Sequence, residues 1–192
     1  MRKYFTSITF FFITSLLTAQ IVTNNGADFD TAQELLDILT DNGGSGITVS
    51  NPVLTTSSSF SSPAGFFEGN SNLGFNSGII LATGGILSAQ PDGASVTGSL
   101  FNLDSDVSIL LDQMNSIQTS INNLIVLEFD FQTSSDEFSL DYIFASNEYT
   151  QNSCIENPDV FGILLSGNGI NGPFSNNAKN IALVPDISDP TT

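Results

Sequence analysis

Hydrophobic and polar residues alternate most regularly in the second half of the chain, where they predict two neighbouring strands. Residues 127–132 and 137–144 place a leucine or an aromatic residue at every second position, with mostly polar residues between them. A period of two residues is typical of a strand with one buried face. The polar residues 133–136 predict a tight turn, and a hairpin centred there places Phe131 opposite Phe138.

Apolar residues at helical spacing predict one helix near the N-terminus, over Asp28–Asn42. Asp28 or Asp30 would cap its start, and Glu34 would lie in the first turn. The glycine pair at 43–44 would end it. The apolar face of this helix consists of Ala32, Leu35, Leu36 and Leu39.

Shorter apolar runs separated by glycine, asparagine and proline predict further strands. The run within 77–83 suits a strand buried on both faces, and Asn51-Pro52 would end the strand that precedes it. Many short strands with one early helix predict a mostly β protein, an antiparallel β-sandwich of the jelly-roll type. The other predicted elements are strands at 47–49, 160–165 and 181–184, a loop or edge strand at 55–62, and a short helical turn within 104–114.

The first residues have the three-part pattern of a secretory signal peptide. Residues 1–3 are a short basic start, residues 4–17 are apolar, and Ala19 is a small residue at the expected cleavage point. A membrane anchor is the alternative, but the apolar stretch is shorter than the ~20 residues that span a bilayer. No later stretch is apolar enough to insert into a membrane. We therefore expect residues 1–19 to be removed and residues 20–192 to form a single secreted domain.

The charge of the chain excludes several kinds of function. It has 20 acidic and 3 basic residues, a formal net charge of −17, and no histidine. Nucleic-acid binding requires Lys and Arg to neutralise phosphates, so nucleic acid is not an expected partner. Without histidine there is no Ser-His-Asp or Cys-His arrangement and no imidazole ligand for zinc. The single cysteine, Cys154, has acidic neighbours that do not favour a nucleophilic thiolate.

Two carboxylates would face each other across the predicted hairpin. In the register that pairs Phe131 with Phe138, Glu128 lies opposite Asp141 on the polar face. Such a pair could serve hydrolysis or hold a metal ion, but a solvated outer face with repulsion screened by salt is the simpler interpretation. Nothing in the sequence marks a cleft around the pair, and there is no Trp to stack on a sugar. We therefore expect no enzyme activity.

A second polar group follows the predicted hairpin and is a candidate calcium site. Its residues are Asn147, Glu148, Asn157 and Asp159. Carboxylate and amide oxygens within one loop are ligands that suit Ca²⁺. Asp104 and Asp106 are a lesser candidate. The alternative is a polar loop whose side chains bond its own backbone, so the cofactor expected is Ca²⁺ or none.

Six short segments follow one another in a fixed order along the chain. They are Gly46–Asn51, Gly78–Gly84, Leu127–Phe131, Tyr142–Tyr149, Asp159–Gly167 and Asn180–Pro185. Together, from about Thr31 to the last residue, they resemble the choice-of-anchor L domain of secreted surface proteins of Bacteroidota-type bacteria. Asn147 departs from the pattern of that family, which usually has a second acid beside Glu148.

The resemblance implies a position near the N-terminal end of a longer surface protein, with further domains and a sorting signal, often of the type IX secretion kind, downstream. It also implies that the domain continues beyond Thr192, so we expect an incomplete copy. The expected function is a secreted, non-catalytic interaction or structural module in adhesion or surface assembly, with an extracellular protein or glycan as partner. The alternatives are a carbohydrate-binding module and, more remotely, a carboxylate-pair hydrolase.

Overall fold

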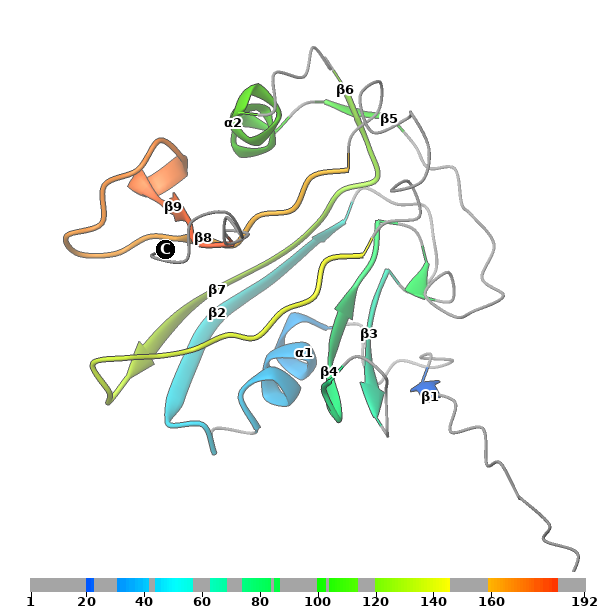
Figure 1. Cartoon of the computed structure of the whole chain (residues 1–192), viewed down its shortest axis with the longest axis vertical. Helices are drawn as coiled ribbons and strands as arrows, with labels where there is room; N and C mark the ends of the chain where they lie inside the picture. The colour runs from blue at the N-terminus through cyan, green and yellow to red at the C-terminus, as the bar shows by residue number, and fades with distance from the viewer. Residues whose placement is uncertain are drawn as a thin grey trace, which may run out of the picture.

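The described part of the chain consists mostly of short strands in small antiparallel sheets, with two short helices (Figure 1). This computed structural model describes residues 20–22, 31–41, 44–56, 63–68, 74–83, 85–86, 100–102, 104–113, 120–145 and 159–182. The strands are β1 (Gln20–Val22), β2 (Ile47–Thr56), β3 (Ala64–Glu68), β4 (Ser77–Leu81), β5 (Leu100–Asn102), β6 (Ser120–Asn122), β7 (Ile125–Thr133), β8 (Leu164–Leu165) and β9 (Lys179–Asn180). The helices are α1 (Ala32–Leu39) and α2 (Ser105–Gln113), and a 3-10 turn covers Ser175–Asn177. The mostly β class and the early helix are confirmed, whereas the jelly-roll-like sandwich stays a prediction.

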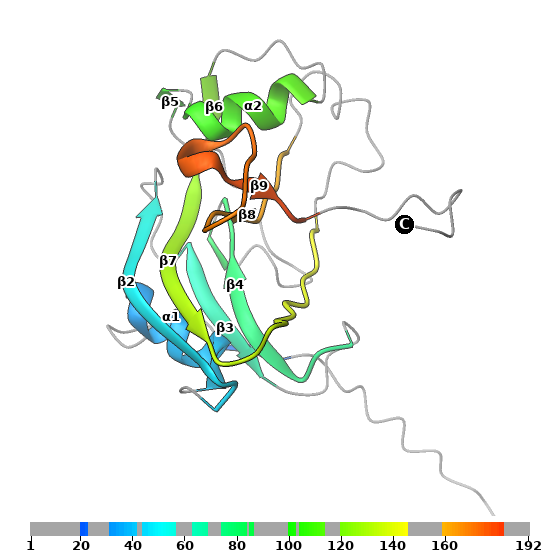
Figure 2. The ribbon, with the colours of Figure 1, turned by 90° about the vertical axis from the view of Figure 1, so that its left-hand side faces the viewer.

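The helices and strands gather into two groups. In both views α1, β3 and β4 lie toward one end, and α2, β5, β6, β8 and β9 lie toward the other (Figures 1 and 2). In the first group, β1, β3 and β4 form an antiparallel sheet. Helix α1 contacts β2, β3 and β4, so it connects this sheet to the separate β2–β7 pair. Leu35 and Leu36 of α1 are fully buried, and the core therefore lies where this helix packs on the two sheets.

Helix α1 is shorter than predicted because its start is fixed by Thr31. The Thr31 hydroxyl accepts a hydrogen bond from the Glu34 backbone N–H at 3.3 Å, and the Glu34 carboxylate accepts one from the Thr31 N–H at 3.2 Å. This reciprocal capping box satisfies two backbone donors at the helix N-terminus. The prediction that Asp28 or Asp30 caps the helix is wrong, because Thr31 is the N-cap; the two aspartates themselves lie outside the described residues. The prediction of Glu34 in the first turn is confirmed.

The longest strand pairing joins β2 and β7 and corrects one prediction. Asn51-Pro52 does not end the strand: β2 continues to Thr56, and the register shifts between Ser50 and Val53, as at a β-bulge. Asn51 has a φ of 54°, a left-handed conformation that asparagine tolerates better than most residues. Its side-chain amide donates to the Asp130 carboxylate on β7 at 2.7 Å. Proline is compatible with a bulge because it has no N–H to leave unsatisfied.

Two substitutions at Asn51 should separate backbone conformation from hydrogen bonding. Asn51→Gly removes the bond to Asp130 and keeps the left-handed backbone accessible, so it should cost well under 1 kcal/mol, as expected for an exposed position. Asn51→Ala removes the same bond but keeps a Cβ in the left-handed region, a cost of about 1–2 kcal/mol that glycine avoids, so it should lose more stability than Asn51→Gly. Urea unfolding of both variants measures the difference. Equal loss of stability in the two would show that the backbone conformation at the bulge contributes nothing.

Strand β3 is not predicted by the sequence pattern, and it is the middle strand of the β1–β3–β4 sheet. Ala64 and Gly65 are adjacent and both buried, so no period of two appears in β3. Strand β4 is half-buried, with Leu81 exposed, and the prediction of a strand buried on both faces is wrong. Among the described strands β4 pairs only with β3, which lies between β1 and β4, so β4 is at the edge of this three-stranded sheet.

The predicted hairpin after β7 does not form a strand pair. β7 itself is confirmed, with its leucine and phenylalanine residues turned inward and Glu128 and Asp130 exposed. Its partner is β2, with Val49 opposite Phe131. Residues 137–145 belong to no strand in the structure and lead from the end of β7 toward β4 (Figure 1). The predicted contact between Phe131 and Phe138 is present, because the centroids of their rings lie 5.0 Å apart.

The second group is tied together by backbone hydrogen bonds to aspartate and asparagine side chains. Asp104 accepts from the Asp106 N–H at 2.8 Å at the start of α2, so the predicted helical turn is a full helix. Asp106 accepts from the Ser175 N–H at 2.8 Å, which links α2 to the C-terminal segment. The side chain of Asn180 accepts from the Ile163 N–H at 3.1 Å. The predicted strand 160–165 is reduced to β8. Strand β9 ends before the predicted strand 181–184; residues 181–182 are in no strand, and residues 183–184 lie outside the described residues.

Candidate functional site

Of the four proposed calcium ligands, the structure describes only Asp159. Asp159 is exposed at the start of a described segment, and Asn147, Glu148 and Asn157 lie outside the described residues. Within the described ranges, no group of three or more acidic or cysteine side chains is placed to hold a metal ion. The lesser candidates, Asp104 and Asp106, accept the backbone hydrogen bonds of α2 and of its neighbour. Calcium binding therefore stays a proposal.

The calcium proposal predicts a specific rise in melting temperature. A ligand that binds only the folded state adds ~2.7 kcal/mol at a hundredfold excess over its Kd. Ca²⁺ should exceed Mg²⁺ at matched ionic strength, because Mg²⁺ demands a stricter octahedral geometry. Thermal unfolding with chelator, Ca²⁺ and Mg²⁺ measures this effect. The proposal is wrong if the two ions act alike, or if Glu148→Gln plus Asp159→Asn leaves the response to Ca²⁺ unchanged.

The expected carboxylate pair is not a register pair in the structure. Glu128 lies opposite Val53 of β2, and Asp141 lies in the segment that forms no strand. Both side chains are exposed. The neighbouring acid, Asp130, accepts the hydrogen bond from Asn51 and so has a structural role. The predicted hairpin does not form, so Glu128 and Asp141 are not paired across neighbouring strands.

Large hydrophobic side chains are exposed along the chain after β7, and we call this surface the apolar strip. Its residues are Phe138, Leu140, Tyr142, Ile143, Phe144, Phe161, Leu164 and Ile181. Each of them exposes between 36% and 48% of its surface. Most of the strip comes from residues 138–144 and 161–164. Ile181 lies beside the second of these segments, because its N–H donates to the Ile163 carbonyl at 2.8 Å. Sequence reasoning placed the first of these segments in a buried face.

Three rings form a cluster within the apolar strip, which we call the aromatic cluster. Phe161 lies 5.4 Å from Tyr142 and 5.6 Å from Phe144, measured between ring centroids. The Phe144 and Phe161 rings are nearly parallel, with an angle of 18° between their planes. Tyr142 and Phe144 are two residues apart on one segment, so the same side of that segment faces Phe161. These distances are typical of aromatic pairs that attract each other.

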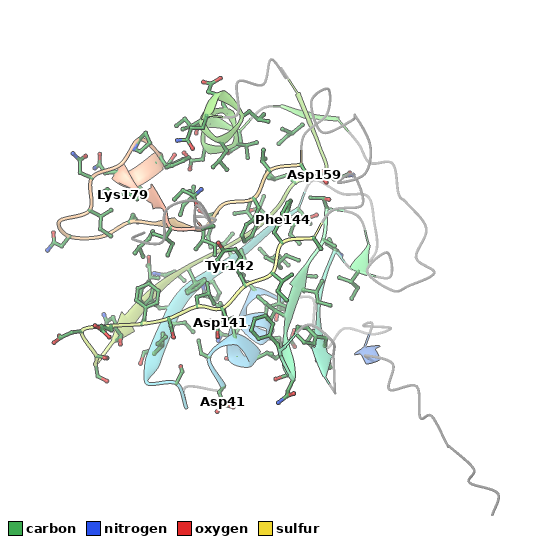
Figure 3. The ribbon with its side chains drawn as sticks, viewed as in Figure 1. Asp41, Asp141, Tyr142, Phe144, Asp159 and Lys179 are labelled. Carbon is green, nitrogen blue, oxygen red and sulfur yellow. The ribbon has the colours of Figure 1, made fainter. Side chains whose placement is uncertain are left out.

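The surroundings of the apolar strip are acidic. Glu137 and Asp141 alternate with its residues along the chain, and Asp159 comes two residues before Phe161; all three are exposed. Lys179 is the one basic residue within the part of the chain that the structure describes. Figure 3 shows Asp141, Tyr142 and Phe144 along one segment, with Lys179 on a separate one. A partner of this surface would therefore meet negative charge around an apolar centre.

Three aromatic residues of the apolar strip belong to segments that the sequence analysis singled out for the family resemblance. Tyr142 and Phe144 belong to one of the six segments that carry the family resemblance, and Phe161 belongs to another. Their order along the chain does not reveal that the two segments meet. Ring contact between these segments is information that only the structure supplies.

Comparisons with known proteins give one match. The sequence model of the Choice-of-anchor L domain family matches residues 22–192. No curated protein and no solved structure is similar enough to the chain to match it. Neither helix in the described ranges is long and apolar enough to cross a membrane.

Proposed function

Because this chain belongs to the Choice-of-anchor L domain family, a family of cell-surface-associated modules, we propose that it acts in adhesion or surface assembly, by binding and without catalysis. The partner is an extracellular protein or glycan. Secretion would follow from a cleaved signal peptide, and cleavage after Ala19 would leave β1 complete, since β1 begins at Gln20. Facing sheets of the jelly-roll type are the architecture that we propose for the whole domain.

The observation that carries this proposal is the apolar strip. Soluble proteins rarely expose a contiguous group of large apolar side chains, and such groups commonly mark interaction sites. In the strip, Phe144 and Phe161 are each 39% exposed, although they are in ring contact. The acids around them keep the surface compatible with water. An apolar centre with a charged margin is the usual composition of a protein interface.

Adhesion of a deletion strain tests the proposal. Loss of the gene should reduce attachment of cells to one another or to a surface, and the wild-type gene should restore it. Phe144→Ser plus Phe161→Ser should not restore attachment, whereas Val53→Ser, an exposed substitution on β2 away from the strip, should. Each variant is quantified on intact cells, so that loss of export is separated from loss of binding. Full attachment without the gene would contradict the proposal.

A carbohydrate-binding module is the second candidate, and the exposed ring of Tyr142, which is tilted by 38° from Phe161, is the observation that favours it. Exposed rings can stack on the apolar faces of sugars. A glycan array probed with the purified chain separates this candidate from a protein-binding module. Binding to one sugar type that Tyr142→Ala abolishes would favour the carbohydrate alternative.

A further inference from the structure

We propose that the apolar strip binds an extended, basic segment of a partner protein, which lies alongside residues 137–141 and places an apolar side chain against the aromatic cluster. This inference rests on the proposed function, because it names the chemistry of the partner at the surface that carries it. The segment that the strip would recognise alternates cationic and apolar residues, so that in an extended conformation its apolar side chains share one face.

The backbone beside the strip is suited to an extended partner. Residues 137–141 belong to no strand in the described structure, yet apolar side chains recur at every second position, at Phe138 and Leu140. An extended peptide can add to such a backbone by main-chain hydrogen bonds, and alternate side chains then supply specificity. Phe138 is fixed at the other end by its ring contact with Phe131 of β7, which orders the segment before a partner arrives.

The aromatic cluster favours a peptide side chain over a sugar. Phe144 and Phe161 are nearly parallel at 5.6 Å, so each ring turns one face toward the other. A sugar-binding platform instead presents open ring faces to the ligand. The remaining ring edges and the exposed face of the cluster suit an aliphatic side chain or the stem of a lysine. Clustered aromatic residues of this kind commonly contribute most of the binding energy of an interface.

The negative charge around the apolar strip favours a basic partner segment. The full chain has a net charge of −17, and the strip is bordered by Glu137, Asp141 and Asp159, all exposed. Two copies of the chain would repel each other at this surface, since like charges raise the free energy of association. The same negative charges attract a basic segment. A lysine or arginine of that segment can also lie over an aromatic ring.

Binding of defined peptides to the purified chain tests this inference. The probe is a short synthetic peptide that alternates lysine and valine, and the comparison peptides alternate glutamate with valine or lysine with serine. Calorimetry at low and at physiological salt should show binding of the lysine–valine peptide alone, weakened as salt rises. Phe144→Ser plus Phe161→Ser should weaken that binding about tenfold or more, as expected for central aromatic residues. Val53→Ser should leave it unchanged.

A second pair of variants tests the charge part separately. Glu137→Gln plus Asp141→Asn should weaken peptide binding several-fold and flatten its dependence on salt, whereas the matched pair Asp37→Asn plus Asp41→Asn, at the end of α1, should not. Binding of all three peptides alike, binding of a neutral β-glucan oligosaccharide at the same surface, or self-association of the chain would overturn the inference. So would a melting temperature of the phenylalanine double variant as low as that of a core variant, because the strip would then be internal. Adhesion that depends on the gene while the peptides fail to bind would overturn only the chemistry of the partner.

Discussion

Replacing Leu36 with alanine is expected to lower the free energy of unfolding by about 2–5 kcal/mol, as large-to-small substitutions in a packed core do. Leu36 has no exposed surface, and it belongs to the helix that contacts strands of both the β1–β3–β4 sheet and the β2–β7 pair. The cavity left behind would therefore weaken two interfaces. Urea unfolding, with circular dichroism as the signal, measures the effect.

Val53→Ala is the control for this prediction. Val53 is 49% exposed on β2, so its truncation to alanine, which removes one carbon fewer than Leu36→Ala, should change stability by no more than about 0.5 kcal/mol. Similar losses in the two variants would contradict the position assigned to α1 in the core. A loss below about 1 kcal/mol for Leu36→Ala would do so as well, because fully buried leucines cost more than that.

The second large effect is expected at Gly65, in the middle strand of the β1–β3–β4 sheet. A Cβ at this position would overlap the Cδ1 atom of Ile86, and Ile86 is itself fully buried. Gly65→Ala should therefore cost about 1–3 kcal/mol through overpacking. The atom that must move is the end of the Ile86 side chain, and the full burial of that side chain limits where it can go.

A double-mutant cycle checks the physical cause. Ile86→Val removes the Cδ1 atom that the new methyl group would meet, at a cost of about 0.5–1.5 kcal/mol on its own. In a chain that already carries Ile86→Val, Gly65→Ala should cost less by about 1 kcal/mol, a coupling energy expected for residues in contact. Additive effects would mean that Gly65 is required for its backbone and not for the space beside Ile86.

Sequence patterns predicted which faces of the strands are buried better than which strands pair. The alternation in 127–132 correctly assigned Glu128 and Asp130 to the exposed face. A period of two fixes the face but carries no information about the partner. The pattern therefore predicts the adjacent segment 137–144 as partner, whereas β7 pairs with β2, which lies far away in the chain.

Two further differences have local physical causes. Asn51-Pro52 is a strand-breaking dipeptide by composition, but the asparagine takes the left-handed conformation and β2 continues as a bulged strand. Strand β3 escaped prediction because Ala64 and Gly65 are both buried, which removes the alternation that identifies a half-covered strand. Helix α1 was predicted with the correct buried leucines, because its apolar spacing and the face that it buries follow the same period.

At the candidate site, too, the sequence pattern does not identify the neighbouring segments. The pattern of 137–144 predicted a buried face, and burial depends on which segments cover that face, which a single strand pattern does not contain. The structure instead leaves Phe138, Leu140 and Phe144 exposed and brings Phe161 into ring contact with Phe144. The polar residues around 147–159 suggested a cation site by chemistry alone, and of these the described structure contains only Asp159.

Binding of the purified, fluorescently labelled chain to intact cells of the strain that lacks the gene is the most direct test of the central claim, that this family member is a surface interaction module which binds through its apolar strip. Saturable binding is expected for the wild type and for Val53→Ser. For Phe144→Ser plus Phe161→Ser, binding should fall to the level of an unrelated acidic protein while the melting temperature stays near that of the wild type. Equal binding by the wild type and this double variant would contradict the claim.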